Sequence, residues 1–434
     1  MNHLQNKPPA VVIDLDCFTG LQTIRILSER NVPVIGVASD PGHYCVKTKM
    51  CKTKIFVDTK SDALIDKLEN LGPSLPEKAV LFPCADSSVL LISKHRERLA
   101  KWYHIALPKH ETVARLMDKM TFIEFAEKEG LAIPQVYFLH SREAAEEAAT
   151  NLIYPCILKP TLKSKIWEAN SKYKAFKVFD AEELLRLYDR YACWTEVLMA
   201  QRFIQGTDAD HYTCNCYFDK TSQPLVSFVS RKLRQWPPTT GTACLSQEWR
   251  NDVVLNATID LFQRTGFYGL GYLEMKQDAM DGKHYIIEPN IGRPTGRSAL
   301  AEASGVELLY TQYCHLTGQP LPENRQQKYN NMKWIYFRRD VQSSLKYWKQ
   351  GDLTLVQWLK SVRGKKVDAL FSWKDPKPFV GDLIRAMKQA ISGNKTKHTP
   401  ESVAQQKSTA DSSQLSAISD QPSKRGYHES PASF

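Results

Sequence analysis

Two glutamates and an asparagine in the second half of the chain could together hold a divalent cation. Glu274 lies in one stretch with strand character, and Glu288 and Asn290 lie at the end of the next. Antiparallel neighbours joined by a short turn can bring their side chains to one face, so these residues would present oxygen ligands from adjacent strands. Mg²⁺ prefers oxygen ligands and keeps positions free for phosphate oxygens. The spacing predicts a nucleotide-metal site, although each acid taken alone could be a solvated strand residue.

The elements that carry these residues belong to a region that the sequence predicts to be α+β. Strands are expected at residues 269–277 and 284–288, joined by an Asp281-Gly282 turn, and another strand is expected at 225–231. Residues 331–385 mix aromatic and basic residues and precede a last amphipathic helix that ends near Ile391. The sequence beyond Gly393 has little to bury, which predicts disorder.

The first hundred or so residues are expected to form a doubly wound α/β domain. Alternating strands and a helix are predicted in close succession at residues 10–16, 21–30, 32–37 and 79–82. Ligands of such sheets bind at the carboxyl ends of the strands, and Asp86 follows one such end. The expected domains are therefore residues 1–112, 113–328 and 329–392, followed by a tail at 393–434.

Composition limits the classes of function. The 434 residues are 24% charged and 42% hydrophobic, with a net charge of +11. No apolar run approaches the roughly 18 residues of a membrane helix, and the ten cysteines lack the spacing of a disulfide framework or zinc site. A cytoplasmic protein is expected. The basic excess lies on the folded body, where phosphate-bearing ligands explain it more economically than nucleic acid or membrane insertion does.

Several stretches fall in the order typical of one family. Glu274, Glu288-x-Asn290 and Arg293 resemble the metal-binding end of the ATP-grasp fold. Asp118-Lys119 resembles the start of its first ATP subdomain, the stretch from Tyr154 to Pro160 resembles its first nucleotide-lysine strand, and Met199 to Gly206 resembles its hinge strand. The resemblance covers roughly residues 10–385. It implies an ATP-grasp fold with an N-terminal Rossmann-like domain and a C-terminal extension.

Within that superfamily the chain resembles the carboxylate-amine ligases, a group that includes D-aspartate ligase, and carbamoyl-phosphate-synthase-like proteins. The stretch from Ser230 to Pro237, Thr240-Gly241-Thr242 and the Asp375-Pro-x-Pro motif carry this likeness. It implies an enzyme that joins small-molecule carboxylate and amine substrates through an acyl phosphate and releases ADP and phosphate. The implied cofactors are ATP and Mg²⁺, with two ions expected and Mn²⁺ able to substitute. The oligomeric state is open, a homodimer included.

The resemblance also assigns roles to cationic residues. Lys119 and Lys159 would neutralise the phosphates, although a lone strand lysine is usually solvated. Arg293 and Arg231 would donate paired hydrogen bonds to the acyl phosphate and the later oxyanion, which makes them the expected catalytic residues. Arg234 and Arg297 would bind the substrate carboxylate, with a surface ion pair as the alternative for each.

The adenine and ribose are expected along the hinge strand. Adenine would lie against Ile157 and Met199 and take backbone hydrogen bonds from Gln201 and Phe203, and Asp208 or Asp210 would bind the ribose. A plain core strand is the alternative. Two departures weaken this mapping, because Arg202 stands where the family usually has an acid and the region that should form a glycine-rich flap contains no glycine. Lysines could replace the flap amides, and the candidates are Lys163, Lys165 and Lys174, beside Ser164, with a solvated basic loop as the alternative.

Two other functions remain open from the sequence. The departures at Arg202 and the flap would suit a degenerate domain that binds nucleotide as a regulator or scaffold. The basic body would suit binding to nucleic acid or to a membrane surface, which salt would weaken steeply.

Overall fold

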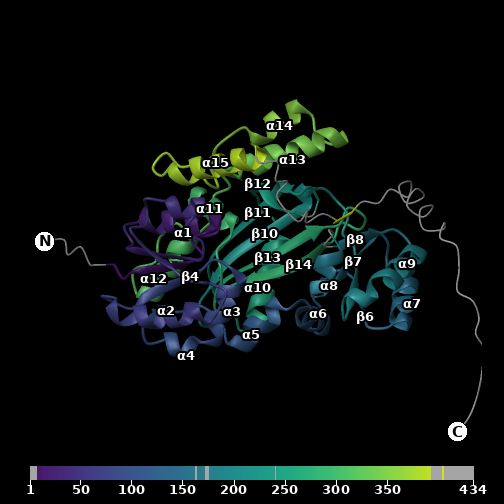
Figure 1. The fold of residues 1–434 in the computed structure, drawn as a ribbon, viewed down its shortest axis with the longest axis horizontal. Coiled ribbons are helices and arrows are strands. Elements are labelled where there is room, and N and C mark those ends of the chain that lie inside the picture. The colour runs from purple at the N-terminus through teal and green to yellow at the C-terminus, as the bar shows by residue number, and fades with distance from the viewer. Residues whose placement is uncertain (1–6, 162–163, 172–174, 240, 392–402, 405–434) are drawn as a thin grey trace, which may run out of the picture.

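A computed structural model of the chain describes residues 7–161, 164–171, 175–239, 241–391 and 403–404. Its strands form three sheets (Figure 1). Within these ranges, no helix has the length and apolar character needed to cross a bilayer. The predicted tail, apart from Val403–Ala404, lies outside the described residues, as do Lys163, Lys174, Thr240 and the side chain of Lys165.

The first sheet is parallel, with strand order β3-β2-β1-β4-β5. Its central strand β1 consists of four apolar residues that are all buried, as expected for a strand covered by helices on both faces. The strands are β1 (Ala10–Ile13), β2 (Val34–Ala38), β3 (Thr53–Phe56), β4 (Ala79–Pro83) and β5 (Tyr103–His104). The helices are α1 (Phe18–Ser28), α2 (Ala63–Leu71), α3 (Asp86–Lys94) and α4 (Arg96–Leu99). A Cβ at Gly20 would lie 2.4 Å from the carbonyl oxygen of Asp14, so glycine lets α1 start directly against the end of β1.

The second sheet has the order β17-β8-β7-β9-β6 and is covered by α7 (Arg142–Asn151) and α9 (Ala181–Tyr191). Its strands are β6 (Val136–Leu139), β7 (Cys156–Pro160), β8 (Ala175–Val178), β9 (Leu198–Arg202) and β17 (Val403–Ala404). The apolar faces of both helices, with Trp167 of α8 (Lys165–Asn170), fill a separate small core. Two helices precede this sheet, α5 (His110–Met117) and α6 (Lys119–Lys128). The carboxylate of Asp118 caps α6 by accepting from Thr121 N at 3.0 Å.

The third sheet is mostly antiparallel, with the order β14-β13-β10-β11-β12-β15-β16. Its strands are β10 (His211–Phe218), β11 (Pro224–Trp236), β12 (Thr242–Glu248), β13 (Gly269–Gln277), β14 (His284–Ile291), β15 (Lys333–Ile335) and β16 (Lys366–Asp368). Helix α10 (Asp252–Arg264) packs against β10, β11 and β13. Helices α11 (Gly296–Ala303) and α12 (Leu308–Thr317) contact strands of the same sheet and also pack against α1. The strand predicted at 225–231 continues to Trp236, so Arg234 lies inside it.

The predicted domain boundaries are crossed by both strands and cores. Strand β15, from the expected C-terminal extension, pairs with β12 and thereby joins the third sheet. One core combines residues of β1 and α1 with residues of α11, α12 and β15, including Leu21, Leu300 and Trp334. The remaining helices, α13 (Phe337–Gln350), α14 (Leu355–Val362) and α15 (Lys377–Ile391), form a layer along one edge of the molecule, at the top of Figure 1. The expected mixture of α/β and α+β architecture is confirmed.

Candidate active site

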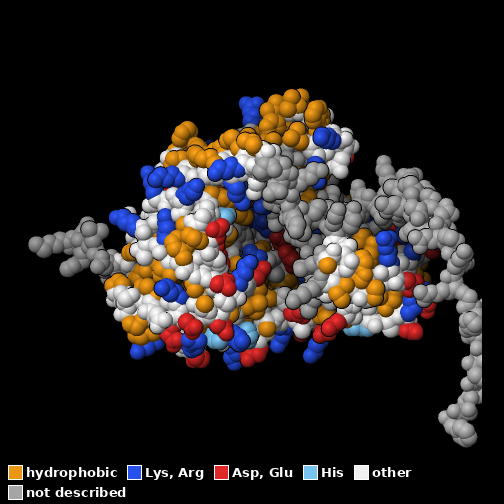
Figure 2. Space-filling view, viewed as in Figure 1, with side chains coloured by type: hydrophobic (Ala, Val, Ile, Leu, Met, Phe, Trp, Pro, Cys, Tyr) orange, Lys and Arg blue, Asp and Glu red, His pale blue; other side chains and the backbone are white. Residues whose placement is uncertain are grey.

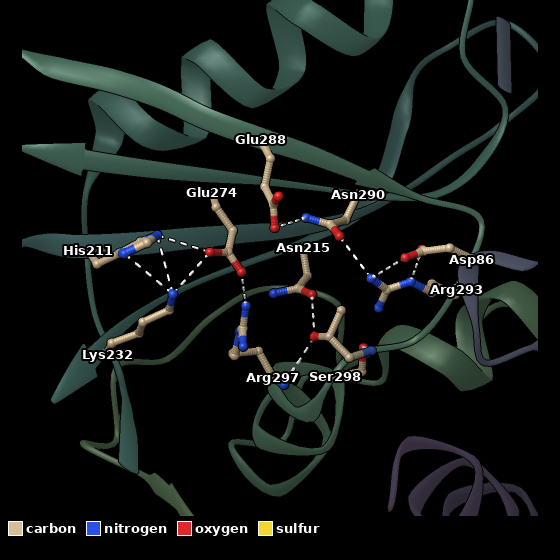
Figure 3. A network of polar contacts seen from close by, with 11 residues as sticks. Asp86, His211, Asn215, Lys232, Glu274, Glu288, Asn290, Arg293, Arg297 and Ser298 are labelled. Atoms are coloured by element: carbon tan, nitrogen blue, oxygen red, sulfur yellow. Dashed lines mark hydrogen bonds and ion pairs between the residues drawn. The ribbon is translucent and has the colours of Figure 1, made fainter. Parts of the chain in front are cut away.

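The three predicted metal ligands share one face of the third sheet. Glu274 on β13 is paired directly with Glu288 on β14, and Asn290 lies two residues further along the same strand. Because side chains alternate along a strand, Glu288 and Asn290 point to the same side. Asn290 Nδ2 lies 3.4 Å from Glu288 Oε1. Figure 3 shows the three side chains grouped on one side of their strands.

This donor set suits a hard divalent cation. In the described part of the chain, no three His, Cys, Asp or Glu side chains gather in a metal-binding cluster, so the candidate site is two carboxylates and a carboxamide. Glu288 is exposed, and no described Lys, Arg or His forms an ion pair with its carboxylate. Such an anion can accept a metal without losing a protein partner. All three side chains bind through oxygen, which is the chemistry that Mg²⁺ prefers.

Glu274 is surrounded by two cationic side chains and an imidazole. Its Oε2 is 2.9 Å from His211 Nε2 and 3.0 Å from Lys232 Nζ, and its Oε1 is 2.5 Å from Arg297 Nη2. Although burial disfavours the charged carboxylate, Lys232 and Arg297 hold the pKa of Glu274 well below its usual range. Burial and then Lys232 lower the pKa of His211 to about 4 despite the neighbouring carboxylate. The group therefore contains a neutral imidazole and an ionised carboxylate at neutral pH.

The two predicted phosphate lysines reach the same cleft from other elements. Lys119 stands at the first position of α6 and Lys159 lies on β7, and both line a cavity of about 620 Å³ with Glu274, Glu288 and Asn290. Lys159 Nζ donates to Gln201 Oε1 at 3.2 Å. Burial, together with Lys119, lowers the pKa of Lys159 to about 8, while Glu288 acts in the opposite direction. An anionic ligand between these lysines would relieve their repulsion.

Arg293 connects the cleft to the first domain. Its Nη2 donates to Asn290 Oδ1 at 2.8 Å, and its Nε donates to the carboxylate of Asp86. Asp86 begins α3, at the carboxyl end of β4, which is where the sequence placed possible ligand-binding residues. The guanidinium thus lies between the candidate metal ligands and the edge of the parallel sheet (Figure 3).

The placements of Arg231 and Arg234 differ from the expected roles. Arg231 points to the face opposite Glu274, and its guanidinium lies 3.3 Å from the ring centroid of Trp249. The neighbouring residue Lys232 occupies the cleft instead, because successive strand residues face opposite sides. Arg234 is buried and pairs with Asp340 of α13 at 2.8 Å, so its guanidinium is used in packing rather than offered to a substrate.

The backbone groups expected to bind adenine have other partners. The N–H of Phe203 donates to the carbonyl of Pro155 at 2.9 Å, and Gln201 lies inside β9 with β7 and β6 on either side. The next amide, that of Ile204, has no hydrogen-bond acceptor among the residues the structure describes, and Ile204 lines the cleft. Its carbonyl accepts from Lys276 Nζ at 2.9 Å. The available donor is therefore one residue later than predicted.

The two acids expected at the ribose are engaged outside this cleft. Asp208 accepts from Gln235 Nε2 at 2.7 Å and from Tyr347 Oη at 2.6 Å, which ties β11 to α13. Asp210 accepts from the backbone N–H of Thr207 at 2.7 Å and closes a local capping box. Neither carboxylate is among the described residues that line the cleft around Glu274. Asp208 thus has partners distant in the sequence and Asp210 has local ones, so both carboxylates are already hydrogen-bonded within the protein.

The two departures from the family pattern have different outcomes. Arg202 forms ion pairs with Asp278 at 2.5 Å and Asp281 at 3.2 Å, so it joins the second sheet to the β13–β14 turn. In the flap region the described hydroxyl of Ser164 caps α8 by accepting from Trp167 N at 2.9 Å. The three flap lysines, which were expected to bind phosphate, lie with their side chains outside the described part of the chain.

Sequence reasoning missed His211 and Lys232 and the contribution of the first domain. Phe18 and Thr19, at the start of α1, line the same cleft as Arg297 and Trp334. The alternation of β11 puts Lys232, not Arg231, on the face of Glu274, but this follows only once β10 is known to separate the two strands. Strand pairing was the missing information.

Comparison with known proteins gives one relative and several solved structures. No family model matches the sequence. The D-aspartate ligase of Enterococcus faecium is 24% identical over 259 residues, which cover 57% of this chain and 60% of that protein. The chain thus spans less than two thirds of the length of this curated relative.

Two solved structures show the similarity of fold. The biotin carboxylase domain of 2-oxoglutarate carboxylase from Hydrogenobacter thermophilus, solved with MgADP, ADP and bicarbonate, has a TM-score of 0.57 and 15% identity, covering 74% of this chain and 72% of that one. Phosphoribosylglycinamide synthetase from Anaerococcus prevotii has a TM-score of 0.55 and 14% identity, covering 72% and 76%. At these identities the likeness is one of architecture.

Proposed function

Because this chain has the ATP-grasp fold, we propose that it is an ATP-dependent ligase that joins a carboxylate to an amine through an acyl phosphate. The observation that carries the proposal is the convergence of oxygen ligands and cations in one cleft. Glu274, Glu288 and Asn290 come from the third sheet, and Lys119 and Lys159 come from α6 and the second sheet. A magnesium nucleotide needs both kinds of group within the length of a triphosphate.

In this proposal ATP lies between the second and third sheets. Adenine lies near Ile157 and Phe203 and accepts from the N–H of Ile204, which has no acceptor among the described residues, while Lys119 and Lys159 contact the phosphates. Glu274, Glu288 and Asn290 would hold Mg²⁺, which screens phosphate charge and polarises the γ-phosphoryl group. To take part, Glu274 would exchange one of its contacts to Lys232, His211 or Arg297 for the ion. The number of ions and the use of Mn²⁺ remain predictions.

The substrate end of the cleft lies toward the first domain, beside Arg293 and Arg297. A carboxylate oxygen of the acid attacks the γ-phosphorus, forming a phosphorus–oxygen bond as the bond to ADP breaks. The amine nitrogen then attacks the acyl carbon, forming the carbon–nitrogen bond, and phosphate leaves while the amine loses a proton. Arg293 takes the catalytic role of orienting the acyl phosphate, and Lys232 replaces Arg231 as the second cation near the developing oxyanion. Arg297 both positions Glu274 and borders the acid.

The comparisons support this class of reaction. The relative from Enterococcus faecium is a D-aspartate ligase, and the neighbour from Hydrogenobacter thermophilus was solved with a magnesium nucleotide. We also propose that the acid and the amine are small molecules and that the protein is cytoplasmic. All ten cysteines are free thiols, as a reducing compartment would keep them.

The proposal is tested with Glu288→Gln, which removes a charge that has no cationic partner among the residues the structure describes. We expect a folded chain whose ADP release in the presence of acid and amine pairs falls at least about a hundredfold, because a metal ligand is lost. ADP formation is measured with a coupled assay, and folding is checked by circular dichroism. Glu127→Gln, on the exposed surface of α6, is the matched control and should retain full activity. Unchanged ADP release by Glu288→Gln would contradict the proposal.

A nucleotide-binding regulator is the second candidate, because Glu274 already has three cationic or imidazole partners in the absence of metal. This function predicts that MgATP raises the unfolding temperature of the chain without any phosphate release. A screen over acid and amine pairs that detects turnover would exclude it.

A further inference from the structure

Exposed apolar side chains are concentrated in the layer formed by α13, α14 and α15. Of the 18 large hydrophobic residues that are exposed in the described chain, 11 lie between Phe337 and Ile391. Trp373 and Ile391 expose 88% and 86% of their surface. Figure 2 shows hydrophobic side chains at this edge of the molecule, over α14 and along α15. A large cluster of exposed apolar side chains marks a surface that binds another protein or a membrane.

Helix α15 provides the clearest geometry. Its exposed apolar residues are Val380, Ile384, Met387 and Ile391, at spacings of four, three and four, so they form one stripe along the helix. The buried side of α15 contains Pro378, Gly381 and Asp382, which lie roughly opposite that stripe. The helix therefore turns its apolar stripe away from the protein. A surface helix of a globular protein usually turns its apolar side toward the core and its polar side toward solvent.

Helices α13 and α14 continue this surface. No residue of α14 is buried, and Leu355, Val356 and Leu359 are exposed on one side of it. Trp348, near the end of α13, exposes 63% of its surface. Trp358 faces inward instead, donating from its indole nitrogen to Asp340 at 2.9 Å. The orientation of α14 is thus set by Trp358, with its aliphatic side left uncovered.

The charge of this layer is strongly positive. Residues 329–391 contain thirteen basic and five acidic side chains, so they account for +8 of the net charge of +11. Nine of the basic side chains are exposed, whereas Asp352 is the one exposed acid among these residues. Asp340, Asp375 and Asp382 are buried in ion pairs with arginines. The outer surface therefore combines lysines with aliphatic and tryptophan side chains.

We propose that the α13–α15 layer docks on the surface of an anionic lipid bilayer, with the apolar stripes entering the headgroup region. The flanking Lys377 and Lys388 would lie at the level of the lipid phosphates. A second copy of the chain fits less well, because two such layers would bring like charges together. Nucleic acid would use the lysines but leave the aliphatic side chains without a partner. The inference is independent of the proposed ligase activity.

The test is flotation of the full-length chain with phosphatidylcholine vesicles that contain or lack phosphatidylglycerol. We expect binding to the anionic vesicles that weakens as salt is raised. Ile384→Glu with Met387→Glu should lower the binding constant more than about tenfold, because charge replaces buried apolar surface. Lys377→Gln and Lys388→Gln should each lower it about fivefold. Val253→Glu and Lys67→Gln change equally exposed residues elsewhere and should leave binding unchanged.

Circular dichroism and unaltered basal ADP release would show that the α15 variants are folded. Absence of binding to anionic vesicles, or binding that the α15 variants retain, would overturn the proposal. A wild-type dimer that the Ile384→Glu and Met387→Glu variant converts to a monomer, without vesicle binding, would assign the surface to a second copy. Binding to single-stranded or duplex nucleic acid in place of vesicles would overturn it in favour of the polyanion.

Discussion

The candidate site balances charge differently at its two ends. At Glu274 a carboxylate is surrounded by Lys232, Arg297 and a neutral His211, so that end already has its counter-ions. At the other end Lys159 and Lys119 repel each other, and burial adds to the cost of charging Lys159. A site built in this way favours an anion beside the lysines and a cation beside Glu288. Both are parts of a magnesium nucleotide.

The lowered pKa of Lys159 predicts that the proposed nucleotide binding depends on pH. With a pKa of about 8 in the free protein, Lys159 loses its proton above that pH, whereas bound phosphates would raise the pKa again. Binding of MgATP just above pH 8 should therefore take up a proton, and affinity should fall by up to about tenfold per pH unit. Isothermal titration in buffers of different ionisation enthalpy measures the uptake.

Two variants of Lys159 separate its charge from its proton. Lys159→Arg keeps a permanent charge, so it should bind MgATP without proton uptake. Lys159→Met should lose both affinity and uptake, whereas Lys128→Met, on the exposed end of α6, should behave as the wild type does. Proton uptake that persists in Lys159→Met would assign it to another group.

At the scale of elements, the third sheet is held to the C-terminal helices by a buried ion pair and a nearby hydrogen bond. Arg234 of β11 donates from Nε and Nη2 to Asp340 of α13 at 2.8 Å and 3.1 Å, and Asp208 accepts from Tyr347 of the same helix. These bonds occupy the guanidinium of Arg234 and the carboxylate of Asp208, the groups that were expected to bind substrate and ribose. They also fix the edge of the sheet that carries the active-site face.

Removing Asp340 should reveal the strength of this attachment. Asp340→Ala leaves the buried guanidinium of Arg234 without its partner, so the free energy of unfolding should fall by about 3–5 kcal/mol. Adding Arg234→Met should restore part of the loss, because no unpaired charge then remains. Urea denaturation followed by circular dichroism gives both values.

A surface pair provides the comparison for Asp340. Asp260→Ala breaks the exposed pair with Arg264, which spans one helical turn of α10, and should cost less than about 1 kcal/mol. Equal losses at the two sites would contradict a structural role for the buried pair.

At the scale of the whole molecule, the predicted C-terminal extension is part of the main body. Strand β15 pairs with β12, and Trp334 lies in the core beneath α1. Arg25 of α1 donates from Nε to Asp375 at 3.0 Å, in a pair that joins the two ends of the described sequence. The first domain, the third sheet and the extension thus share one core.

A chain that ends at residue 328 should therefore fail to fold cooperatively. It lacks β15, the core side chain of Trp334 and the carboxylates that pair with Arg25 and Arg234. A chain that ends at residue 391 keeps these elements and should show a single cooperative thermal transition. Calorimetry and circular dichroism compare the two, and a cooperative transition in the shorter chain would show that the extension is a separate unit.

The sequence by itself determined the features that local chemistry encodes. Apolar runs and turn residues placed β1, β2, β4 and β13, and the paired strands at Glu274 and Glu288 predicted a shared face. Each of these depends on residues within a few positions of one another. Their order along the chain was sufficient to identify the fold.

Only the tertiary structure decided which cations face the cleft. Arg231 and Lys232 are adjacent in sequence, and the pairing of β10 between β11 and β13 is what directs Lys232 to Glu274 and Arg231 to Trp249. Likewise, the bond from Phe203 to Pro155 leaves Ile204 as the next amide of this segment, and it has no acceptor among the described residues. These outcomes depend on strand register and on partners distant in sequence, because a shift of one residue turns every side chain to the other face.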